Sequence, residues 1–300
     1  MKITFLGTGA AWGNPELGCN CDACSYARTH GGKDRRRRTA LFVETSSEKL
    51  LVDCGPDIRE QLMGQRASPG LEYDPIEEFD ALLITHSHTD HINGLDELSA
   101  LRRSEWVDSI PAYATESAWG EIMKRFGYLV GNEGEGRLFI RRLAFPGVQL
   151  VGLQTNVTPF KVEHGPTAPG AVGYIFQDGD KKVVYTGDFY DVPIRDERLK
   201  EPDLLIMECN WYNEPRTQPK TSWHMSFQRA LSFIQSWSPK RVVLVHISHE
   251  DFTRTPLNTP IGTRPKNHAE WQLSVNRKRN QVGLGGLPIE VSYDGMVVTI

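Results

Sequence analysis

A dense group of metal-binding side chains constrains this chain more than any other feature. It follows the apolar run from Phe79 to Thr85 and places three histidines and an aspartate within six positions: His86, His88, Asp90 and His91. A single histidine in a core needs no special explanation, but several imidazoles beside a carboxylate are hard to bury unless they bind something. We therefore predict that this segment binds metal ions.

The spacing of these residues indicates two ions rather than one. Residues two apart in an extended segment point the same way, so His86 and His88 can reach one ion. Asp90 and His91 lie past the bend into a helix and can reach another. Two dications about 3.5–4 Å apart repel each other strongly unless an anionic ligand bridges them. Asp188, at the end of a strand-like run, is our candidate for that bridge.

Two further histidines complete the two predicted ligand sets. His164 follows the run Val157–Glu163, and His246 follows the run Arg241–Val245. Asp53 also ends a short apolar run, and we expect it to orient a ligand imidazole rather than to bind metal itself. The sequence thus predicts a binuclear site assembled from segments that lie far apart in the chain.

A second metal-binding pattern lies near the N-terminus. Cys19, Cys21 and Cys24 offer three thiolates and leave one position of a tetrahedral site to be filled. His249, three residues after His246, is our candidate for the fourth ligand. Four protein ligands leave no open position, so we expect a structural zinc; a redox-active thiol centre is the alternative.

Strand-like runs alternate with helical patterns along the chain, which favours layered sheets flanked by helices. Leucines spaced three apart from Leu95 to Leu101, and apolar residues from Phe227 to Trp237, indicate helices. The segment Ile289–Ile300 predicts two short strands around the turn-prone pair Asp294-Gly295. No repeat or linker marks a boundary, so we expect a single domain over residues 1–300.

Two stretches fit this alternation poorly. They are residues 114–150, which include a loop from Gly131 to Gly136, and residues 251–286, which are polar and basic. We expect surface loops in both. The alternative is that they cap the site or form the contact of a homodimer.

Composition and charge exclude several classes of protein. The net charge of −4 disfavours a stable complex with nucleic acid, which needs a basic surface. No stretch approaches the roughly 18 apolar residues that span a bilayer, and the start lacks the hydrophobic segment of a signal peptide. Five cysteines, an odd number, suit metal binding in a reducing compartment. We expect a cytoplasmic protein with no membrane partner.

The order of the candidate ligands resembles the metallo-β-lactamase superfamily over nearly the whole chain. The resemblance rests on the run His86–His91, followed by His164, Asp188 and His246. It implies an α/β protein with an αβ/βα four-layer sandwich and an active site with two divalent ions, Zn or Mn. Flavin-linked di-iron members carry Glu where this chain has His88, which favours hydrolysis over oxygen reduction.

Four shorter motifs are similar to the PhnP-like phosphodiesterases of bacterial phosphonate breakdown. They are Leu6-Gly7-Thr8-Gly9, the cysteine triplet, His246-Ile247-Ser248-His249 and Tyr293-Asp294-Gly295-Met296. This narrower resemblance implies a Cys3His zinc and cleavage of a small phosphodiester, either a cyclic ribose phosphate or a nucleotide-like ester. A metalloprotein of quinone-cofactor biosynthesis with redox chemistry and an RNA-processing nuclease are the alternatives.

We assign the catalytic roles to Asp90, which is also a candidate ligand, and to His224. An alkoxide leaves poorly unless it is protonated, and His224 is similar in position to the acid histidine of the family. The alternative is a histidine at a helix start that bonds to the backbone. Arg38, the last residue of the basic run Arg35–Arg38, is the arginine expected to face a substrate phosphate, whereas most of the run is solvated.

Overall fold

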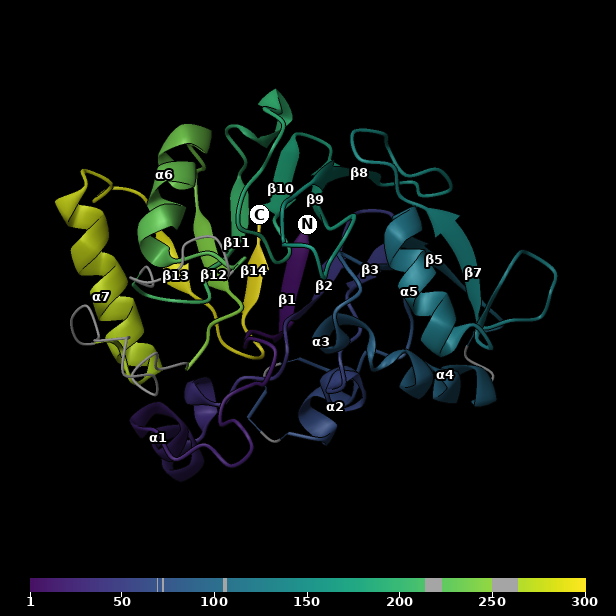
Figure 1. Cartoon of the computed structure of the whole chain (residues 1–300), viewed down its shortest axis with the longest axis horizontal. Coiled ribbons are helices and arrows are strands. Elements are labelled where there is room, and N and C mark those ends of the chain that lie inside the picture. The colour runs from purple at the N-terminus through teal and green to yellow at the C-terminus, as the bar shows by residue number, and fades with distance from the viewer. Residues whose placement is uncertain (69, 72, 105–106, 214–222, 250–263) are drawn as a thin grey trace.

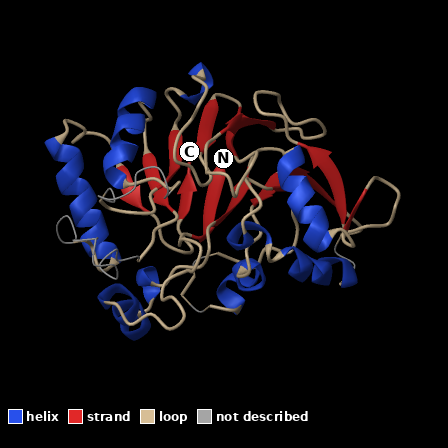
Figure 2. Ribbon diagram, in the orientation of Figure 1, coloured by secondary structure: helices blue, strands red, loops and turns tan. Residues whose placement is uncertain are grey.

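The computed structural model of this chain describes residues 1–68, 70–71, 73–104, 107–213, 223–249 and 264–300 (Figure 1). Two β-sheets lie at its centre, and helices lie to the outside of them (Figure 2). The N- and C-termini are neighbours, since the Met1 amino group donates to the Ile300 carbonyl at 3.2 Å and the Ile300 amide donates back at 3.0 Å.

The first sheet has eight strands within the described residues. Their bounds are β1 Lys2–Gly7, β2 Ala40–Glu44, β3 Lys49–Val52, β4 Ala81–Leu83, β5 Ile110–Ala114, β6 Val130–Gly131, β7 Phe139–Leu143 and β14 Val297–Thr299. Their order across the sheet is β14-β1-β2-β3-β4-β5-β7-β6. Strand β3 is parallel to β4, and β4 is parallel to β5.

The second sheet has six strands in the same part of the chain. Their bounds are β8 Asn156–Lys161, β9 Val172–Asp178, β10 Lys181–Tyr185, β11 Leu204–Glu208, β12 Val242–Val245 and β13 Ile289–Val291. Their order is β13-β12-β11-β10-β9-β8. Strands β10 to β13 are mutually parallel, and β9 runs antiparallel to both of its neighbours.

Seven α-helices lie in the described part of the chain, and some of them cover the outer faces of the two sheets. Their bounds are α1 Asp22–His30, α2 Ile58–Met63, α3 Thr89–Ile92, α4 Ser99–Arg103, α5 Glu116–Phe126, α6 Phe227–Trp237 and α7 His268–Gln281, with short 3-10 turns at Gly32–Asp34, Gly64–Arg66, Leu95–Leu98 and Glu197–Leu199. Helix α6 illustrates how the sequence sets these limits. The Ser226 hydroxyl accepts from the Arg229 amide at its start, and Ser238 ends it in the left-handed conformation.

Successive side chains of a strand point to opposite faces of its sheet, so each sheet can pack on the other sheet with one face and on helices with the other. Leu41 of β2 and Ile206 of β11 meet in one apolar cluster between the two sheets. Phe42, next along β2, packs instead with Trp119 of α5, and Leu205 packs in the cluster that includes α6 and α7. Helix, sheet, sheet and helix therefore stack in that order, and the predicted αβ/βα four-layer sandwich is confirmed.

The two short strands predicted at the end of the chain are present, and they belong to different sheets. Two strands do form around Asp294-Gly295, but β13 pairs with β12 in the second sheet, whereas β14 pairs with β1 in the first. The Gly295 amide donates to the Phe5 carbonyl at 2.8 Å, so the turn is held against β1. The last residues therefore connect the two sheets rather than form a hairpin.

The expectation of surface loops in residues 114–150 is wrong for much of that stretch. It contains α5, β6 and β7, because Trp119 and Ile122 bury an apolar helix face and Phe139 adds to the same core. In residues 251–286, α7 begins at His268 and buries Trp271, while residues 250–263 lie outside the described part of the chain. No helix among the described residues has the length and apolar character that crossing a membrane requires.

The inter-sheet core sets the stability of this fold. Phe176 of β9 is fully buried between the sheets, so Phe176→Ala should lower the free energy of unfolding by about 3–5 kcal/mol. Phe145→Ala is the matched control, since Phe145 is 55% exposed and should change stability by less than about 0.5 kcal/mol. Urea unfolding measures both, and equal losses would contradict the assignment of the core.

Candidate metal centre

The strand ends bring the candidate ligands to one edge of the sandwich. Strands β10, β11 and β12 run parallel, so their carboxyl ends lie together, and β8 runs in the same direction because two antiparallel pairings separate it from β10. In the first sheet, β3 and β4 are parallel as well. Residues that follow these strands are Asp53, His86, His164, Asp188 and His246.

One set of imidazoles comprises His86, His88 and His164. One ring nitrogen of each lies within 4.8 Å of the others. His164 Nε2 is 3.1 Å from His88 Nδ1. The Nδ1 of His164 donates to the Trp223 carbonyl at 2.8 Å, which leaves its Nε2 as the nitrogen with the free lone pair.

A second set comprises Asp90, His91, Asp188 and His246, whose ligand-type atoms also lie within 4.8 Å of one another. Asp188 stands between the two sets. One of its oxygens is 3.3 Å from His91 Nε2 and 3.8 Å from His164 Nε2, and the other is 3.1 Å from His246 Nδ1. The structure therefore brings together the seven residues that the sequence selected, in the two predicted groups.

Several polar atoms at this place are buried and make no hydrogen bond to the described residues. They are the Nε2 atoms of His86, His91 and His246 and both carboxylate oxygens of Asp188. Each unsatisfied buried polar atom costs about 1–3 kcal/mol, so their concentration needs a compensating partner. Neutral imidazoles and carboxylates are ligands of divalent transition metals, and the residues present fit such ions.

The electrostatics of the two sets suit cation binding. Burial lowers the pKa of His164 to about 3 and that of His246 to about 4, so both imidazoles stay neutral and keep their lone pairs. Burial alone would raise the pKa of Asp188, but electrostatic attraction to His246 and His91 and the close contact with His91 Nε2 outweigh burial and hold that pKa well below its usual value. Burial alone would lower the pKa of His91, but Asp188, Asp90 and Asp53 outweigh it and raise that pKa, so His91 carries the positive charge that faces Asp188. The Asp188 carboxylate is therefore ionised, as a ligand between two cations must be.

Asp53 makes the contact that the sequence predicted for it. It is fully buried and accepts from His91 Nδ1 at 2.8 Å. The backbone amide of Thr85 donates to the same carboxylate at 2.8 Å, and the Thr85 hydroxyl donates to it at 2.9 Å. These bonds hold the His91 ring so that its Nε2 faces Asp90 and Asp188.

His224 lies beside both sets and bonds to a carboxylate rather than to the backbone. Its Nδ1 donates to Glu208, and its ring stacks on His246 with 5.4 Å between centroids and meets His164 edge-on at 4.7 Å. Burial alone would lower the pKa of His224, but the charge and hydrogen bond of Glu208 outweigh it and raise that pKa to about 9. The His224 ring is therefore protonated at neutral pH.

Glu208 is a residue of this site that was not among the sequence-predicted ones, although its position in the sequence carries a signal. Glu208 ends the apolar strand β11 in the same way that Asp188 follows β10 and His246 follows β12. It is fully buried, and its other oxygen accepts from the Phe189 amide. The rule that an apolar run ends in a polar residue selects Glu208 when it is applied to every strand.

Arg38 has partners other than the candidate metal centre. Its guanidinium lies 3.2 Å and 3.3 Å from the two Asp57 carboxylate oxygens, and its Nε donates to the Ala11 carbonyl at 3.1 Å. These contacts hold the segment after β1. The expected contact of Arg38 with a substrate phosphate stays a prediction.

A cavity of about 230 Å³ opens beside His224 and His246. Residues 10–13 form part of its wall, and Ser248 and His249 form another part. The cavity thus gives a small molecule access to the two histidines that border the candidate metal centre.

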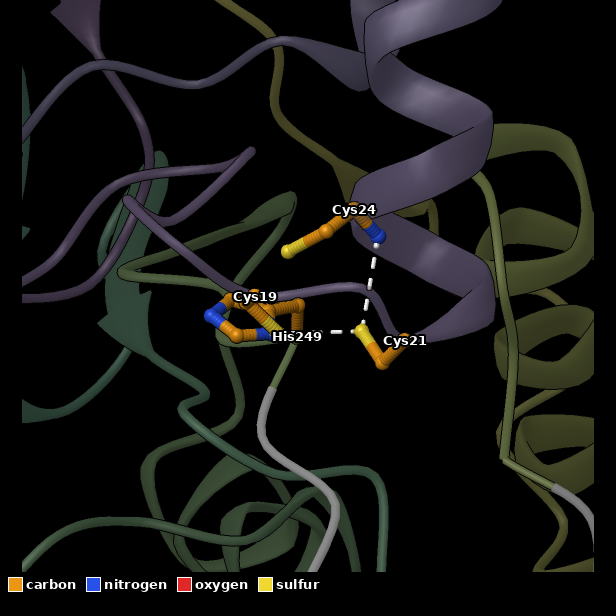
Figure 3. Close-up of side chains that lie close together, drawn as sticks. All are labelled: Cys19, Cys21, Cys24 and His249. Carbon is orange, nitrogen blue, oxygen red and sulfur yellow. Dashed lines mark hydrogen bonds between the residues drawn. The ribbon is translucent and has the colours of Figure 1, made fainter.

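The cysteine triplet and His249 form a separate cluster (Figure 3). Their ligand-type atoms lie within 4.8 Å of one another, with 3.5 Å from Cys21 Sγ to His249 Nδ1 and 3.9 Å from Cys19 Sγ. His249 Nε2 donates to the Glu16 carboxylate at 2.8 Å, which leaves Nδ1 to face the thiols. The sequence did not single out Glu16, because its approach to His249 depends on the path of a loop.

Short backbone contacts connect this cluster with the candidate metal centre. His246 and His249 are three residues apart, and between them the Ile247 amide donates to the Thr8 carbonyl at 2.9 Å. The Ala10 amide donates to the Ile247 carbonyl at 3.3 Å. The cysteine cluster therefore anchors the segment that carries His246 and one wall of the cavity.

Comparison with known proteins identifies the class. The Beta-lactamase superfamily domain matches residues 48–247, and the chain belongs to this superfamily of metal-dependent hydrolases. In structure the chain resembles a diphosphatase of the PhnP family, on which it superposes with a TM-score of 0.72 and 25% identity, over 100% of this chain and 97% of that one.

Two relatives in sequence have names that indicate other activities. The exodeoxyribonuclease WalJ of Streptococcus pneumoniae is 30% identical over 231 residues, which are 76% of this chain and 74% of the relative. An octanoyltransferase of Porphyromonas gingivalis is 28% identical over 263 residues, which are 83% of this chain. The chain spans only 46% of that second relative's length.

Metal removal should destabilise the protein, because the buried polar atoms lose their partner. When the free ion concentration is about 100 times the dissociation constant, binding raises the free energy of unfolding by about 2.7 kcal/mol. This corresponds to a rise of about 5–10 °C in melting temperature. We expect that loss when a chelator strips the ions, and recovery when Zn or Mn is returned.

Asp188→Asn should weaken this metal-dependent gain in melting temperature. The control is Asp180→Asn, whose side chain is 87% exposed and which should keep the full gain. Calorimetry with and without metal measures both. An equal gain in all three proteins would show that Asp188 does not hold the ions.

Proposed function

We propose that this chain is a binuclear metal-dependent phosphodiesterase that hydrolyses a small cyclic ribose phosphate or a nucleotide-like ester. The observation that carries the proposal is the position of Asp188, which is buried with its carboxylate oxygens 3.1 to 3.8 Å from ring nitrogens of both groups of metal-type side chains. His86, His88 and His164 would hold one Zn or Mn ion, and Asp90, His91 and His246 the other.

The ions, when bound, lower the pKa of a water and neutralise the oxygens of a phosphodiester. The protein's own groups then complete the reaction. His91 outweighs burial and lowers the pKa of Asp90 to about 2, so this carboxylate remains ionised and can orient the attacking water. The attack takes place at phosphorus, in line with the leaving oxygen.

His224 would protonate that leaving oxygen. Its Nδ1 is committed to Glu208, so its Nε2 is the nitrogen available to substrate. The raised pKa keeps the proton on His224 until an alkoxide forms nearby, and the cavity lets a small ester reach the ring. Glu208 acts through His224, as an orienting and charge-stabilising group.

The Cys19, Cys21, Cys24 and His249 cluster would hold a zinc with a structural role. Its four ligands leave no position for substrate, and Glu16 sets the tautomer of the histidine. This zinc would fix the segment that carries His246 and would not take part in the chemistry.

A second candidate function is cleavage of DNA ends, favoured by the 30% identity to an exodeoxyribonuclease across most of both chains. The net charge of −4 is unfavourable for a long polyanion, and the cavity of about 230 Å³ suits a small ester. A panel of cyclic nucleotides, cyclic ribose phosphates and DNA or RNA oligonucleotides separates the candidates. Iron content together with oxygen consumption would instead indicate the redox alternative.

The two predicted metal sites should respond differently to substitution. Asp188→Ala should reduce hydrolysis of a cyclic ribose phosphate by about 10³-fold or more, since it removes the proposed bridge. Cys21→Ser should lower the melting temperature and the yield of folded protein, while the fraction that folds keeps most of its turnover. Steady-state kinetics and thermal melts check both. No turnover of any diester by the metal-loaded chain would overturn the proposal.

The pH profile tests the partnership of His224 and Glu208. An acid loses its proton as pH rises through its pKa, so the rate should fall on the alkaline side of neutrality. Glu208→Gln removes the charge that raises the pKa of His224, so this fall should move to lower pH and kcat should drop by about 10- to 100-fold. Glu197→Gln, on an exposed turn, is the control. An unmoved alkaline limb in Glu208→Gln would contradict the assignment.

A further inference from the structure

An exposed tryptophan stands at the mouth of the catalytic cavity. Trp12 is 60% exposed, and it lines the same cavity as His224 and His246. Single exposed apolar residues are ordinary on protein surfaces. A large exposed indole that lines the same cavity as the proposed acid is a different case, because a ligand bound in that cavity can contact both side chains.

The backbone around Trp12 is held in place from several sides. The Gly13 amide donates to the Ala10 carbonyl at 2.8 Å, which closes a tight turn with Trp12 inside it. Arg38 Nε binds the Ala11 carbonyl from one side. Gly13 itself has a φ of +66° and lies against the Arg36 carbonyl, so the turn admits no side chain there.

The neighbours of Trp12 leave space beside its ring. Ala10, Ala11 and Gly13 carry at most a methyl group, so no bulky side chain of this segment competes for the cavity. The other aromatic residues nearby are engaged in packing: Trp211 is 7% exposed and meets His224 edge-on, and Trp223 packs on Tyr190. Trp12 is therefore the aromatic residue of this wall that is open to a ligand.

We propose that Trp12 is a specificity-determining residue that stacks on the nucleobase of the substrate, which makes the preferred ester a nucleotide rather than a base-free sugar phosphate. The proposal rests on the phosphodiesterase function argued above and narrows its substrate. A flat indole on a tethered turn can stack on a base at low entropic cost. The cavity of about 230 Å³ is small for a strand, and a base stacked on the exposed Trp12 would lie at its edge while the phosphate end of the ester enters toward His224.

The test compares two esters that share a reacting centre. One is adenosine 2′,3′-cyclic phosphate, and the other is the methyl riboside 2,3-cyclic phosphate, in which a methyl group replaces the base. Stacking on an aromatic side chain changes affinity by about 5- to 100-fold per base, so the unchanged chain should prefer the adenosine ester by about tenfold in kcat/KM.

Trp12→Ala should remove this preference and leave turnover of the methyl riboside within about twofold, whereas Trp12→Phe should retain most of the preference. Leu17→Ala is the control, since Leu17 is 99% exposed on the same segment and should change neither ester. Equal loss on both esters in Trp12→Ala, or no loss on either, would overturn the proposal.

A binding measurement separates this proposal from the proposed function. Calorimetry with adenosine 5′-monophosphate and ribose 5-phosphate reports the subsite even if neither cyclic ester is hydrolysed. We expect the nucleotide to bind about tenfold more tightly, and Trp12→Ala to equalise the two dissociation constants. Turnover of no diester would refute the phosphodiesterase, whereas equal affinities in the unchanged chain would refute the base-stacking role.

Discussion

The buried carboxylate of Asp188 is the constraint on which the rest of this structure depends. It lies between two groups of imidazoles, at 3.8 Å from His164, 3.3 Å from His91 and 3.1 Å from His246. A buried carboxylate is strongly unfavourable unless positive charge lies beside it, and divalent cations held between the two groups would supply that charge. Burial lowers the pKa of His164 and of His246, so these two imidazoles keep the lone pairs that a cation needs.

The four-layer fold makes this convergence possible. Parallel strands end at a common edge, and each candidate ligand follows such an end, so residues far apart in sequence meet without long loops. The stiff inter-sheet core then keeps the distances between ligands small and fixed. The cysteine cluster adds a second anchor, since His249 and His246 share one short segment.

The sequence was sufficient for layered sheets flanked by helices and for the grouping of the ligand-type residues, because both follow from local rules. The four-layer αβ/βα arrangement came from the family resemblance. Strand runs that end in polar residues predict which side chains meet, and His86 to His91 marks the centre directly. The roles of these residues as ligands remain predictions. Glu208 follows the same rule and was overlooked.

Other features depend on tertiary geometry that no local pattern carries. The separation of β13 and β14 into two sheets depends on which neighbour each strand finds. Glu16 meets His249, and Trp12 meets the cavity, only because their loop is folded back by backbone bonds to Arg36 and Ile247. The helix and strands within residues 114–150 were not predicted, because glycines and charged residues interrupt the apolar pattern of that stretch.

The most direct test of the central claim is a crystal structure of the zinc-loaded protein with anomalous scattering recorded at the zinc absorption edge. Our account predicts two peaks about 3.5–4 Å apart with Asp188 bridging them. A third peak should lie among Cys19, Cys21, Cys24 and His249. A single peak at the histidine cluster, or Asp188 turned away from both positions, would contradict the account.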